Sequence, residues 1–359
     1  MKKIDDIRKK IDEIDRNILD LLNMRAEMVK GIAELKRKEN LPTFDPSRER
    51  RIIEELSRRN KGPLTEKDIE SIMGTIFKIY RGMFRPLKIA YLGPEGTFTH
   101  QAALKKFGEK GEFISCKTID NIFREVEKDR ADYGVVPIEN SMEGVVTHTL
   151  DMFVESSLNI TAEILLDVHH YLLSDERSLK SVKKVFSHSQ AIGQCWNWIV
   201  ENLPDAKLIE TESTATAVKM AKREKNAAAI GSLTAAEIYD IGVLAERIED
   251  YGENITRFLV IGKNFSGKTG KDKTSILVSI KDKVGALHDI LSHFRKNKIN
   301  LTRIESRPSK KKAWDYIFFF DFIGHKDDAS VKNALKRIEK ESVFLKILGS
   351  YPVGGKDGE

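Results

Sequence analysis

A long heptad repeat at the start of the chain is the feature that most constrains its fold. Apolar side chains recur there in alternating steps of three and four residues, the a/d pattern of a helix that packs against another helix along one seam. We call this set the heptad seam: Ile4, Ile7, Ile11, Ile14, Ile18, Leu21, Arg25, Met28, Ile32 and Leu35. A helix of roughly 33 residues is ~50 Å long. A monomer cannot bury such a seam alone, so we expect a partner helix to cover it.

Two more helices are predicted before the pattern changes. The Asn40-Leu41-Pro42 sequence breaks the long helix, and Asp45-Pro46 is typical of an N-cap followed by proline at the first helical position. Gly62-Pro63 ends this second helix, and Thr65–Asp68 resembles a capping box that opens a third. Residues 1–86 are therefore predicted to form an all-α domain.

Two further domains are predicted after this helical one. Short apolar runs alternate with helical patterns through residues 87–264, which predicts an α/β domain with a largely parallel sheet and two lobes around a cleft. A linker rich in glycine, serine and charge follows at Phe265–Asp272. Residues 273–352 then show a βαββαβ order, which is typical of the ferredoxin-like α+β fold.

Composition argues against several classes of protein. The most apolar stretch, Tyr316–Ile323, is much shorter than the ~18 residues of a membrane span, and the acidic start gives no secretory signal. Two cysteines, Cys116 and Cys195, are too few for a disulfide framework or a thiolate metal site. The net charge is +6, but basic and acidic residues are interleaved at helical spacing, as on a solvated helix face. We therefore expect a cytoplasmic protein that binds neither membrane, metal nor nucleic acid.

Arg25 is the exception in the heptad seam. A buried, unpaired guanidinium would be very costly, so Arg25 must pair with an acid, reach solvent or hold an anionic ligand. Arg8 and Lys36 share another heptad position beside the seam. Arg8 lies ~25 Å from Arg25 along the helix, too far for one small ligand to touch both. An antiparallel partner helix would bring the second protomer's Arg8 close to Arg25.

Together with the start of the second helix, these residues resemble the all-helical chorismate mutase domain. The motif is Ile7-Arg8-x-x-Ile11-x-x-Ile14-Asp15, then Leu21-Leu22-x-x-Arg25, Lys36 and Asp45-x-x-Arg48-Glu49, and the match runs from Lys2 to about Arg85. The resemblance implies an intertwined dimer that converts chorismate to prephenate. It implies that two arginines clamp the carboxylates of chorismate, that a lysine bonds the ether oxygen and that a glutamate bonds the ring hydroxyl. The chorismate-binding residues would be Arg8, Arg25, Lys36, Asp45, Arg48 and Glu49.

Two positions of the third helix depart from the chorismate mutase pattern. The family normally carries a small hydroxyl residue and, four positions on, a Gln or Glu that reaches the ether oxygen; here they are Tyr80 and Phe84. Losing one oxyanion-type donor typically costs ~100- to 1000-fold in rate. Either Arg81 or Arg85 substitutes, or the mutase is weak.

Polar clusters follow the predicted strands of the middle domain, where open α/β sheets bind ligands. The turn Gly93-Pro94-Glu95-Gly96-Thr97 precedes a helix and suits an anion held on backbone N–H groups. Taken singly, each cluster could be a helix cap or a turn. The other clusters are Val135–Gly144, Ser187–Ala191, Glu212–Ala217 and Asn254–Phe258.

As a set, these clusters resemble prephenate dehydratase across the whole middle segment. The resemblance implies two lobes like those of periplasmic binding proteins, with prephenate in the cleft. Prephenate would lose its hydroxyl and its ring carboxylate to give phenylpyruvate, and because aromatisation drives the reaction no cofactor is expected. The prephenate-binding residues would be Gly96, Thr97, Ser141, Ser187, Ser213 and Thr214.

Thr256, in the Thr-Arg-Phe motif, corresponds to the family's essential hydroxyl. It could donate or relay a hydrogen bond to the departing hydroxide, or position a water. Arg257 is expected to hold a substrate carboxylate. Glu139 and Asn140 are further catalytic candidates.

The third domain carries two motifs that resemble the ACT regulatory domain attached to prephenate dehydratases. They are Asp282–Leu287, at the start of its first helix, and Glu305–Pro308, at the end of its second strand. The resemblance implies L-phenylalanine bound at a dimer interface and hence a homo-oligomer, at least a dimer. The effector-binding residues would be Gly285, Ala286, Leu287, Glu305, Ser306 and Arg307.

The three resemblances together predict a bifunctional enzyme of phenylalanine biosynthesis that is inhibited by L-phenylalanine. The alternative is a dehydratase alone, with a degenerate helical domain kept for dimerisation. A third possibility is a two-lobed binding module with an amino-acid sensor and no catalysis. The Thr256-Arg257-Phe258 motif argues against that module, because a binder has no need of it.

Overall fold

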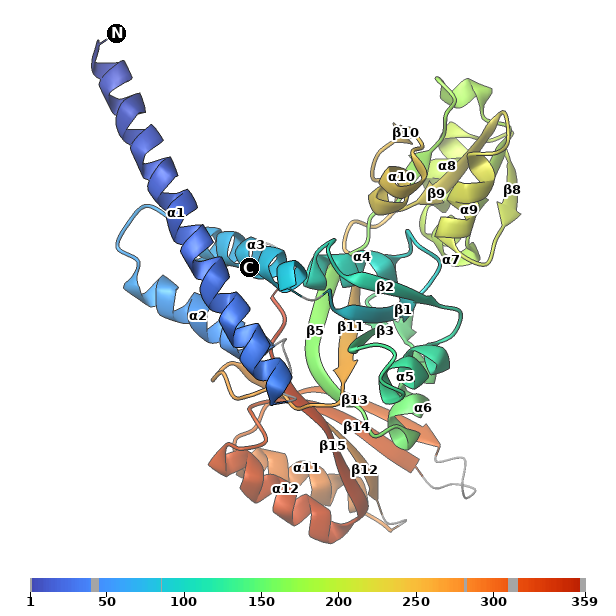
Figure 1. The fold of residues 1–359 in the computed structure, drawn as a ribbon. Helices are drawn as coiled ribbons and strands as arrows, with labels where there is room; N and C mark the ends of the chain where they lie inside the picture. Colours follow the sequence, from blue (N-terminus) through green and yellow to red (C-terminus); the bar gives the residue numbers. More distant parts are fainter. Residues whose placement is uncertain (1, 40–44, 85, 281–282, 309–315, 356–359) are drawn as a thin grey trace.

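The computed structural model describes residues 2–39, 45–84, 86–280, 283–308 and 316–355 of the chain (Figure 1). The predicted helix break at Asn40–Pro42, and Arg85 and Asp282, lie outside these residues. Within them, a helical segment, a two-lobed α/β segment and a C-terminal α+β segment follow one another. None of the helices in these ranges is both long and apolar enough to cross a membrane.

The helical segment consists of α1 (Lys2–Lys38), α2 (Pro46–Arg59) and α3 (Glu66–Phe84). Asp45 caps α2 by accepting a hydrogen bond from the Arg48 N–H at 3.0 Å. Thr65 and Asp68 form the predicted capping box, because each side chain accepts from the other's backbone N–H, at 3.2 and 2.7 Å. Both predicted helix starts are confirmed.

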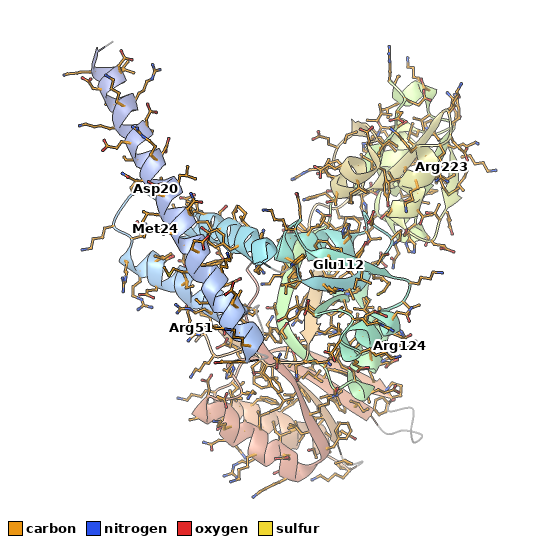
Figure 2. The ribbon with its side chains drawn as sticks, in the orientation of Figure 1. Asp20, Met24, Arg51, Glu112, Arg124 and Arg223 are labelled. Atoms are coloured by element: carbon orange, nitrogen blue, oxygen red, sulfur yellow. The ribbon has the colours of Figure 1, made fainter. Side chains whose placement is uncertain are left out.

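In this single chain most of the heptad seam is exposed to solvent. Figure 1 shows α1 reaching well beyond α2 and α3, and in Figure 2 the side chains of Asp20 and Met24 project from it. The apolar side chains of the seam are about half exposed or more, from 49% at Ile11 and Ile18 to 69% at Met28, while Arg25 is partly buried. An apolar stripe of this length in contact with water is an interaction surface.

The first lobe is one sheet with strand order β2-β1-β3-β11-β5, and the short β4 pairs with β3. Helix α4 packs on one face, while α5 and α6 pack on the other. The elements are β1 (Lys88–Leu92), α4 (Phe98–Phe107), β2 (Glu112–Cys116), α5 (Ile119–Glu127), β3 (Tyr133–Asn140), β4 (Gly144–Val145), α6 (Thr147–Glu155), β5 (Asn159–Asp167) and β11 (Ile255–Gly262).

The second lobe is a sheet with strand order β10-β6-β9-β7-β8. Its elements are β6 (Tyr171–Leu173), the short 3-10 helix Leu179–Ser181, β7 (Lys184–Ser187), α7 (Ser189–Gln194), α8 (Trp196–Asn202), β8 (Lys207–Glu210), α9 (Thr214–Ala221), β9 (Ala227–Gly231), α10 (Leu233–Tyr239) and β10 (Val243–Ala245).

The two sheets correct the expectation of a largely parallel sheet. In the first lobe β11 runs antiparallel to both of its neighbours. In the second lobe β6 runs antiparallel to both β9 and β10. The reason lies in the path between the lobes. The chain leaves the first sheet at the end of β5 and returns at the same edge to start β11, so β11 must run back across the sheet.

The C-terminal segment has the predicted βαββαβ order and an antiparallel sheet with strand order β13-β14-β12-β15. Its elements are β12 (Asp272–Ile280), α11 (Ala286–Lys296), β13 (Leu301–Pro308), β14 (Tyr316–Ile323), α12 (Ala329–Glu341) and β15 (Ser342–Pro352). The helices cover one face, and the other face shares a buried core with the first lobe. In that shared core, Leu277, Phe319 and Leu348 pack with Val136 and Leu259.

The segment between these two sheets is packed and is not a flexible tether. The buried Ser266 donates a hydrogen bond from its hydroxyl to the Thr161 carbonyl at 2.6 Å. The carboxylate of Asp272 accepts from the backbone N–H groups of Thr269 and Gly270 at 2.8 and 2.9 Å. The C-terminal sheet is therefore tied closely to the first lobe.

At Gly349 the backbone of β15 lies close to that of β5, and this yields a stability prediction. A Cβ atom at Gly349 would lie 2.2 Å from the Ile160 carbonyl oxygen, and backbone cannot move aside as a side chain can. We expect Gly349→Ala to lower the free energy of unfolding by about 1–3 kcal/mol, measured by denaturant unfolding. Gly355→Ala is the control, because a Cβ there meets nothing within 4 Å. Equal stability of the two variants would contradict this packing.

Candidate functional site

A cavity of about 650 Å³ lies between the two lobes. The first lobe supplies the carboxyl ends of β1 and β3 and the start of β11, while the second supplies the starts of α7 and α9. Five residues of the predicted set line it: Thr97, Asn140, Ser213, Thr214 and Thr256. Ligands of open α/β sheets bind at such an edge.

Two helix N-termini line this cavity from opposite lobes. Thr97 caps α4 by accepting from the His100 N–H at 3.3 Å, and Ser213 caps α9 by accepting from the Thr216 N–H at 3.1 Å. Helix N-termini carry a partial positive charge and free N–H groups, so both favour carboxylates. Lys117 also lines the cavity. The cavity suits an anionic ligand.

The hydroxyl of Thr256 is oriented by Asn140. The Asn140 amide group donates to Thr256 Oγ1 at 2.8 Å, while its own Oδ1 accepts from the backbone N–H groups of Met142 and Glu143 at 2.9 and 3.0 Å. The two backbone donors fix which end of the amide faces Thr256. Because the threonine oxygen accepts this bond, its own hydrogen is available to a ligand in the cavity.

Several cavity residues belong to motifs of the sequence but were not predicted as site residues. Gln194 Oε1 accepts from Asn254 Nδ2 at 2.9 Å and lies 2.8 Å from His170 Nε2, so His170 carries its proton on Nε2. Across the cleft, Glu143 accepts from Gln190 at 3.3 Å and from Gln194 at 3.0 Å. Glu143, Gln190 and Asn254 each lie in a quoted motif, so only their side-chain directions were missing from the sequence.

Three predicted residues lie near the cavity without lining it. Ser187 is fully buried and donates to the Ile230 carbonyl at 2.9 Å. Ser141 lies on the rim and accepts from the Ile255 N–H at 3.0 Å. Gly96, at positive φ, packs on α10, where an added Cβ would lie 3.0 Å from the Ala235 Cβ. Their contacts are with other parts of the two lobes, and none of the three is among the residues that line the cavity.

Arg257 and Glu139 lie on the face of the sheet that points away from the cavity. Arg257 Nη1 lies 3.0 Å from Glu139 Oε1 and 2.6 Å from Asp321 Oδ2, and Arg257 Nε lies 2.8 Å from Glu163 Oε2. Consecutive strand residues point to opposite faces, so Thr256 and Arg257 cannot both enter the cleft. This geometry does not support the expectation that Arg257 holds a substrate carboxylate.

A second candidate region surrounds Arg25 in the helical segment. The Arg25 guanidinium lies 5.3 Å from the Phe77 ring centre and 4.9 Å from that of Tyr80, at cation–π distance. The Tyr80 hydroxyl donates to the Leu22 carbonyl at 2.7 Å, so this side chain joins α3 to α1. The side chain of Phe84 lies outside the described residues.

Other predicted residues of this region are spread along the helices. Burial raises the pKa of Glu49, and the nearby charges of Arg81 and Lys106 offset part of that rise. Arg81 Nε lies 3.6 Å from Glu49 Oε1. Arg8 is exposed, 3.7 Å from Asp5 on the same helix, so one chain does not bring it to Arg25. Lys36 is partly buried on α1, while Arg48 is exposed at the start of α2.

The predicted effector residues belong to two elements of the C-terminal segment. Gly285 precedes α11 with φ of 79°, a conformation that favours glycine, and Ala286 and Leu287 begin the helix. The others lie on the edge strand β13: Glu305, Ser306 and Arg307. Arg307 Nη2 lies 3.4 Å from Asp151 of α6 in the first lobe.

Three family models match successive parts of the chain: chorismate mutase type II over residues 7–83, prephenate dehydratase over 89–266 and the ACT domain over 274–340. A bifunctional chorismate mutase/prephenate dehydratase of Aquifex aeolicus is 49% identical over 356 residues, covering 98% of both chains. A prephenate dehydratase of Methanocaldococcus jannaschii is 40% identical, covering 74% of this chain and 98% of its own.

A solved structure agrees with these matches. It is a prephenate dehydratase from Arthrobacter aurescens in complex with L-Phe, 33% identical, with a TM-score of 0.69. The similarity covers 74% of this chain and 90% of that one. The family matches and the solved structure agree with the two-lobed segment and the C-terminal segment of this chain.

His170 yields a prediction about pH. Burial lowers its pKa, and the bond to Gln194 offsets this only in part. An NMR titration of the imidazole, with the signal assigned by its loss in His170→Gln, should show a neutral ring protonated on Nε2 and a pKa below the ordinary histidine value. The unfolded chain binds that proton at higher pH, so stability falls as the pH drops through the ordinary histidine range. A pKa at or above the ordinary value would contradict the buried placement.

Proposed function

The chain belongs to the family of bifunctional chorismate mutase/prephenate dehydratases, and from this premise we propose which residues carry its two reactions. The enzyme converts chorismate to prephenate, and prephenate to phenylpyruvate, in phenylalanine biosynthesis. For the second reaction one observation carries the assignment. The hydroxyl of Thr256 faces the cleft with its hydrogen free, because Asn140 supplies the bond that its oxygen accepts.

Prephenate is a dianion whose ring becomes aromatic when it loses hydroxide and CO2. We place its carboxylates at the N-terminal ends of α4 and α9, near Thr97 and Ser213, and its hydroxyl at Thr256. The Thr256 hydrogen bond stabilises the departing hydroxide, and the helix N-termini hold the substrate in place. Asn140 orients Thr256 and is therefore a positioning residue. Aromatisation supplies the driving force, so the chain's own residues suffice.

Thr256→Val tests this assignment, because valine has nearly the same shape and lacks only the hydroxyl. We expect prephenate turnover to fall at least ~100-fold, the scale of one lost oxyanion-type donor, while chorismate turnover and the thermal midpoint stay unchanged. Phenylpyruvate absorbance and chorismate consumption are measured on the same sample. Thr161→Val is the matched control, because its hydroxyl donates to the Val260 carbonyl at 3.2 Å and it does not line the cavity. Prephenate turnover within about tenfold of wild type in Thr256→Val would remove the hydroxyl from the mechanism.

For the mutase reaction we place chorismate beside Arg25, with Lys36, Asp45, Arg48 and Glu49 around it. Arg25 would bind one carboxylate, Lys36 the ether oxygen and Glu49 the ring hydroxyl. The burial that raises the pKa of Glu49 favours a carboxyl that can itself donate a hydrogen bond. The Tyr80 hydroxyl donates its hydrogen bond to the Leu22 carbonyl. We therefore assign to Arg81, which lies beside Glu49, the hydrogen bond that the family's third helix normally gives to the ether oxygen.

We infer that two chains pair along α1 in an antiparallel arrangement. The heptad seam is exposed in one chain, and burying each large apolar side chain contributes ~1.5–3 kcal/mol. In this dimer each mutase pocket takes Arg8 from the partner, since Arg8 and Arg25 lie far apart on one helix.

A cytoplasmic location remains a prediction from the sequence.

Mixing Arg8→Ala and Arg25→Ala proteins tests the shared pocket. Each variant alone should lose most chorismate turnover, since each lacks one carboxylate clamp in both pockets. One pocket of a hybrid dimer regains both arginines, so denaturing and refolding the mixture should restore up to about a quarter of wild-type activity if the chains pair at random. Mass spectrometry of the intact dimers verifies that hybrids form. Hybrids without restored activity would exclude the shared pocket.

We assign L-phenylalanine as the effector of the C-terminal segment. The Arthrobacter aurescens dehydratase, which shares this architecture, was solved in complex with L-Phe. The N–H groups at the start of α11, following Gly285, would hold its carboxylate. The strand β13, with Glu305, Ser306 and Arg307, is at the edge of its sheet among the described strands, and such an edge can pair with a second copy.

A further inference from the structure

A cluster of buried and partly buried charges joins the back of the cleft to the C-terminal sheet. We call Arg257, Glu139, Glu163, Lys273, Arg303 and Asp321 the Arg257 cluster; its three cations balance its three carboxylates. Tyr351 and Ser275 complete the contacts, because Arg257 Nη2 donates to the Tyr351 hydroxyl at 3.0 Å and Ser275 Oγ donates to Asp321 at 2.5 Å. Arg257 is 7% exposed and Asp321 is 6% exposed.

Arg257 and Asp321 form the ion pair at the centre of this cluster. Burial lowers the pKa of Arg257, but the neighbouring Tyr351, Asp321 and Glu163 raise it further than burial lowers it. Burial raises the pKa of Asp321, but the Arg257 charge and the Ser275 hydrogen bond bring it below its usual value. Removing either Arg257 or Asp321 would leave the other as an uncompensated buried charge, so this pair holds the centre of the cluster in place.

The cluster and the proposed catalytic pair share the same two stretches of backbone. In the β11–β3 ladder Thr256 lies opposite Asn140, and the next pair is Arg257 opposite Glu139. The first pair faces the cleft and the second faces the C-terminal sheet. The register shifts directly after Arg257, so these two pairs end the regular ladder. A movement of the Arg257–Glu139 pair would therefore move Thr256 and Asn140.

The cluster also reaches the strand that carries the proposed effector residues. Arg303 Nε lies 3.1 Å from Glu139 Oε2, while Arg257 holds the other oxygen of the same carboxylate. Arg303 lies on β13, two residues before Glu305. Glu139 is thus held by the first lobe on one oxygen and by β13 on the other.

We propose that Arg257 and Glu139 are positioning residues that hold Thr256 and Asn140 in place, and that Arg303 transmits the position of β13 to this pair. This inference rests on the proposed function, which supplies the roles of Thr256 and of phenylalanine. An effector that shifts β13 changes the position of Arg303 relative to the Glu139 carboxylate. A displaced Glu139 would move Asn140, the next residue on β3, and Thr256, which is paired with Asn140.

Arg303→Gln in the full chain tests the transmission step. Without phenylalanine, kcat for prephenate should stay within about twofold of wild type, because Arg257 still holds Glu139. Phenylalanine affinity, measured by calorimetry without prephenate, should stay within about threefold. The ratio of kcat/KM without and with saturating phenylalanine should fall at least tenfold toward one. An unchanged ratio, with phenylalanine still bound, would overturn the proposal.

Two control variants separate this inference from the proposed function. Lys346→Met removes another contact between the C-terminal sheet and the first lobe, because Lys346 Nζ donates to the Phe153 carbonyl at 2.8 Å, away from the Arg257 cluster. It should keep the wild-type ratio. Gly285→Val alters the proposed effector site and should lose phenylalanine binding itself. Retained binding in Gly285→Val would count against that site and leave the Arg303 test intact.

Arg257→Lys and Asp321→Asn test the positioning step. Neither side chain lines the cleft, so both variants should lower kcat for prephenate at least tenfold while KM changes by less than about threefold. A large rise in KM with unchanged kcat in Arg257→Lys would mean that Arg257 binds substrate, and would overturn the proposal. Circular dichroism and the thermal midpoint identify a variant that fails to fold, in which case Arg303→Gln decides.

Discussion

The alternation of side chains along β11 is the constraint on which the rest of this structure depends. Thr256 enters the cleft, and Arg257, the next residue, must point to the opposite face. The same alternation separates Asn140 from Glu139 on β3. One strand pair thus carries a neutral hydrogen-bonding pair on the side of the cleft and a charged pair on the side of the C-terminal sheet.

Each face has a partner suited to its chemistry. The cleft face needs donors whose positions are fixed before substrate arrives, since preorganised hydrogen bonds are what stabilise charge in a transition state. Asn140 meets that need because two backbone N–H groups lock its amide. The other face is closed by the C-terminal sheet, which adds Asp321 and Tyr351 to the contacts that the buried Arg257 guanidinium makes with Glu139 and Glu163 of the first lobe.

The helical segment differs from the two lobes, because a single chain leaves its longest apolar surface exposed. The heptad seam is exposed along α1, and Arg25 sits in it over two aromatic rings of α3. A pericyclic rearrangement needs a pocket that holds one conformer of the substrate and bonds the breaking ether oxygen. Tyr80 stands at a position where the family carries a small hydroxyl residue, and its own hydroxyl joins α3 to α1. Arg81, the next residue, lies beside Glu49.

The sequence by itself determined the features that short stretches of chain encode. These include the heptad seam, the helix starts at Asp45 and Thr65, the order of elements in the C-terminal sheet and the motifs that identify the family. Only the tertiary structure decided which face of β11 forms the cleft, that β11 runs antiparallel, and that the segment around Ser266 is packed. A period of two says that Thr256 and Arg257 point apart, but it does not say which of them meets the ligand. That choice belongs to residues distant in the chain: Asp321, 64 positions beyond Arg257, draws the guanidinium to the back of the sheet and leaves the cleft to the threonine.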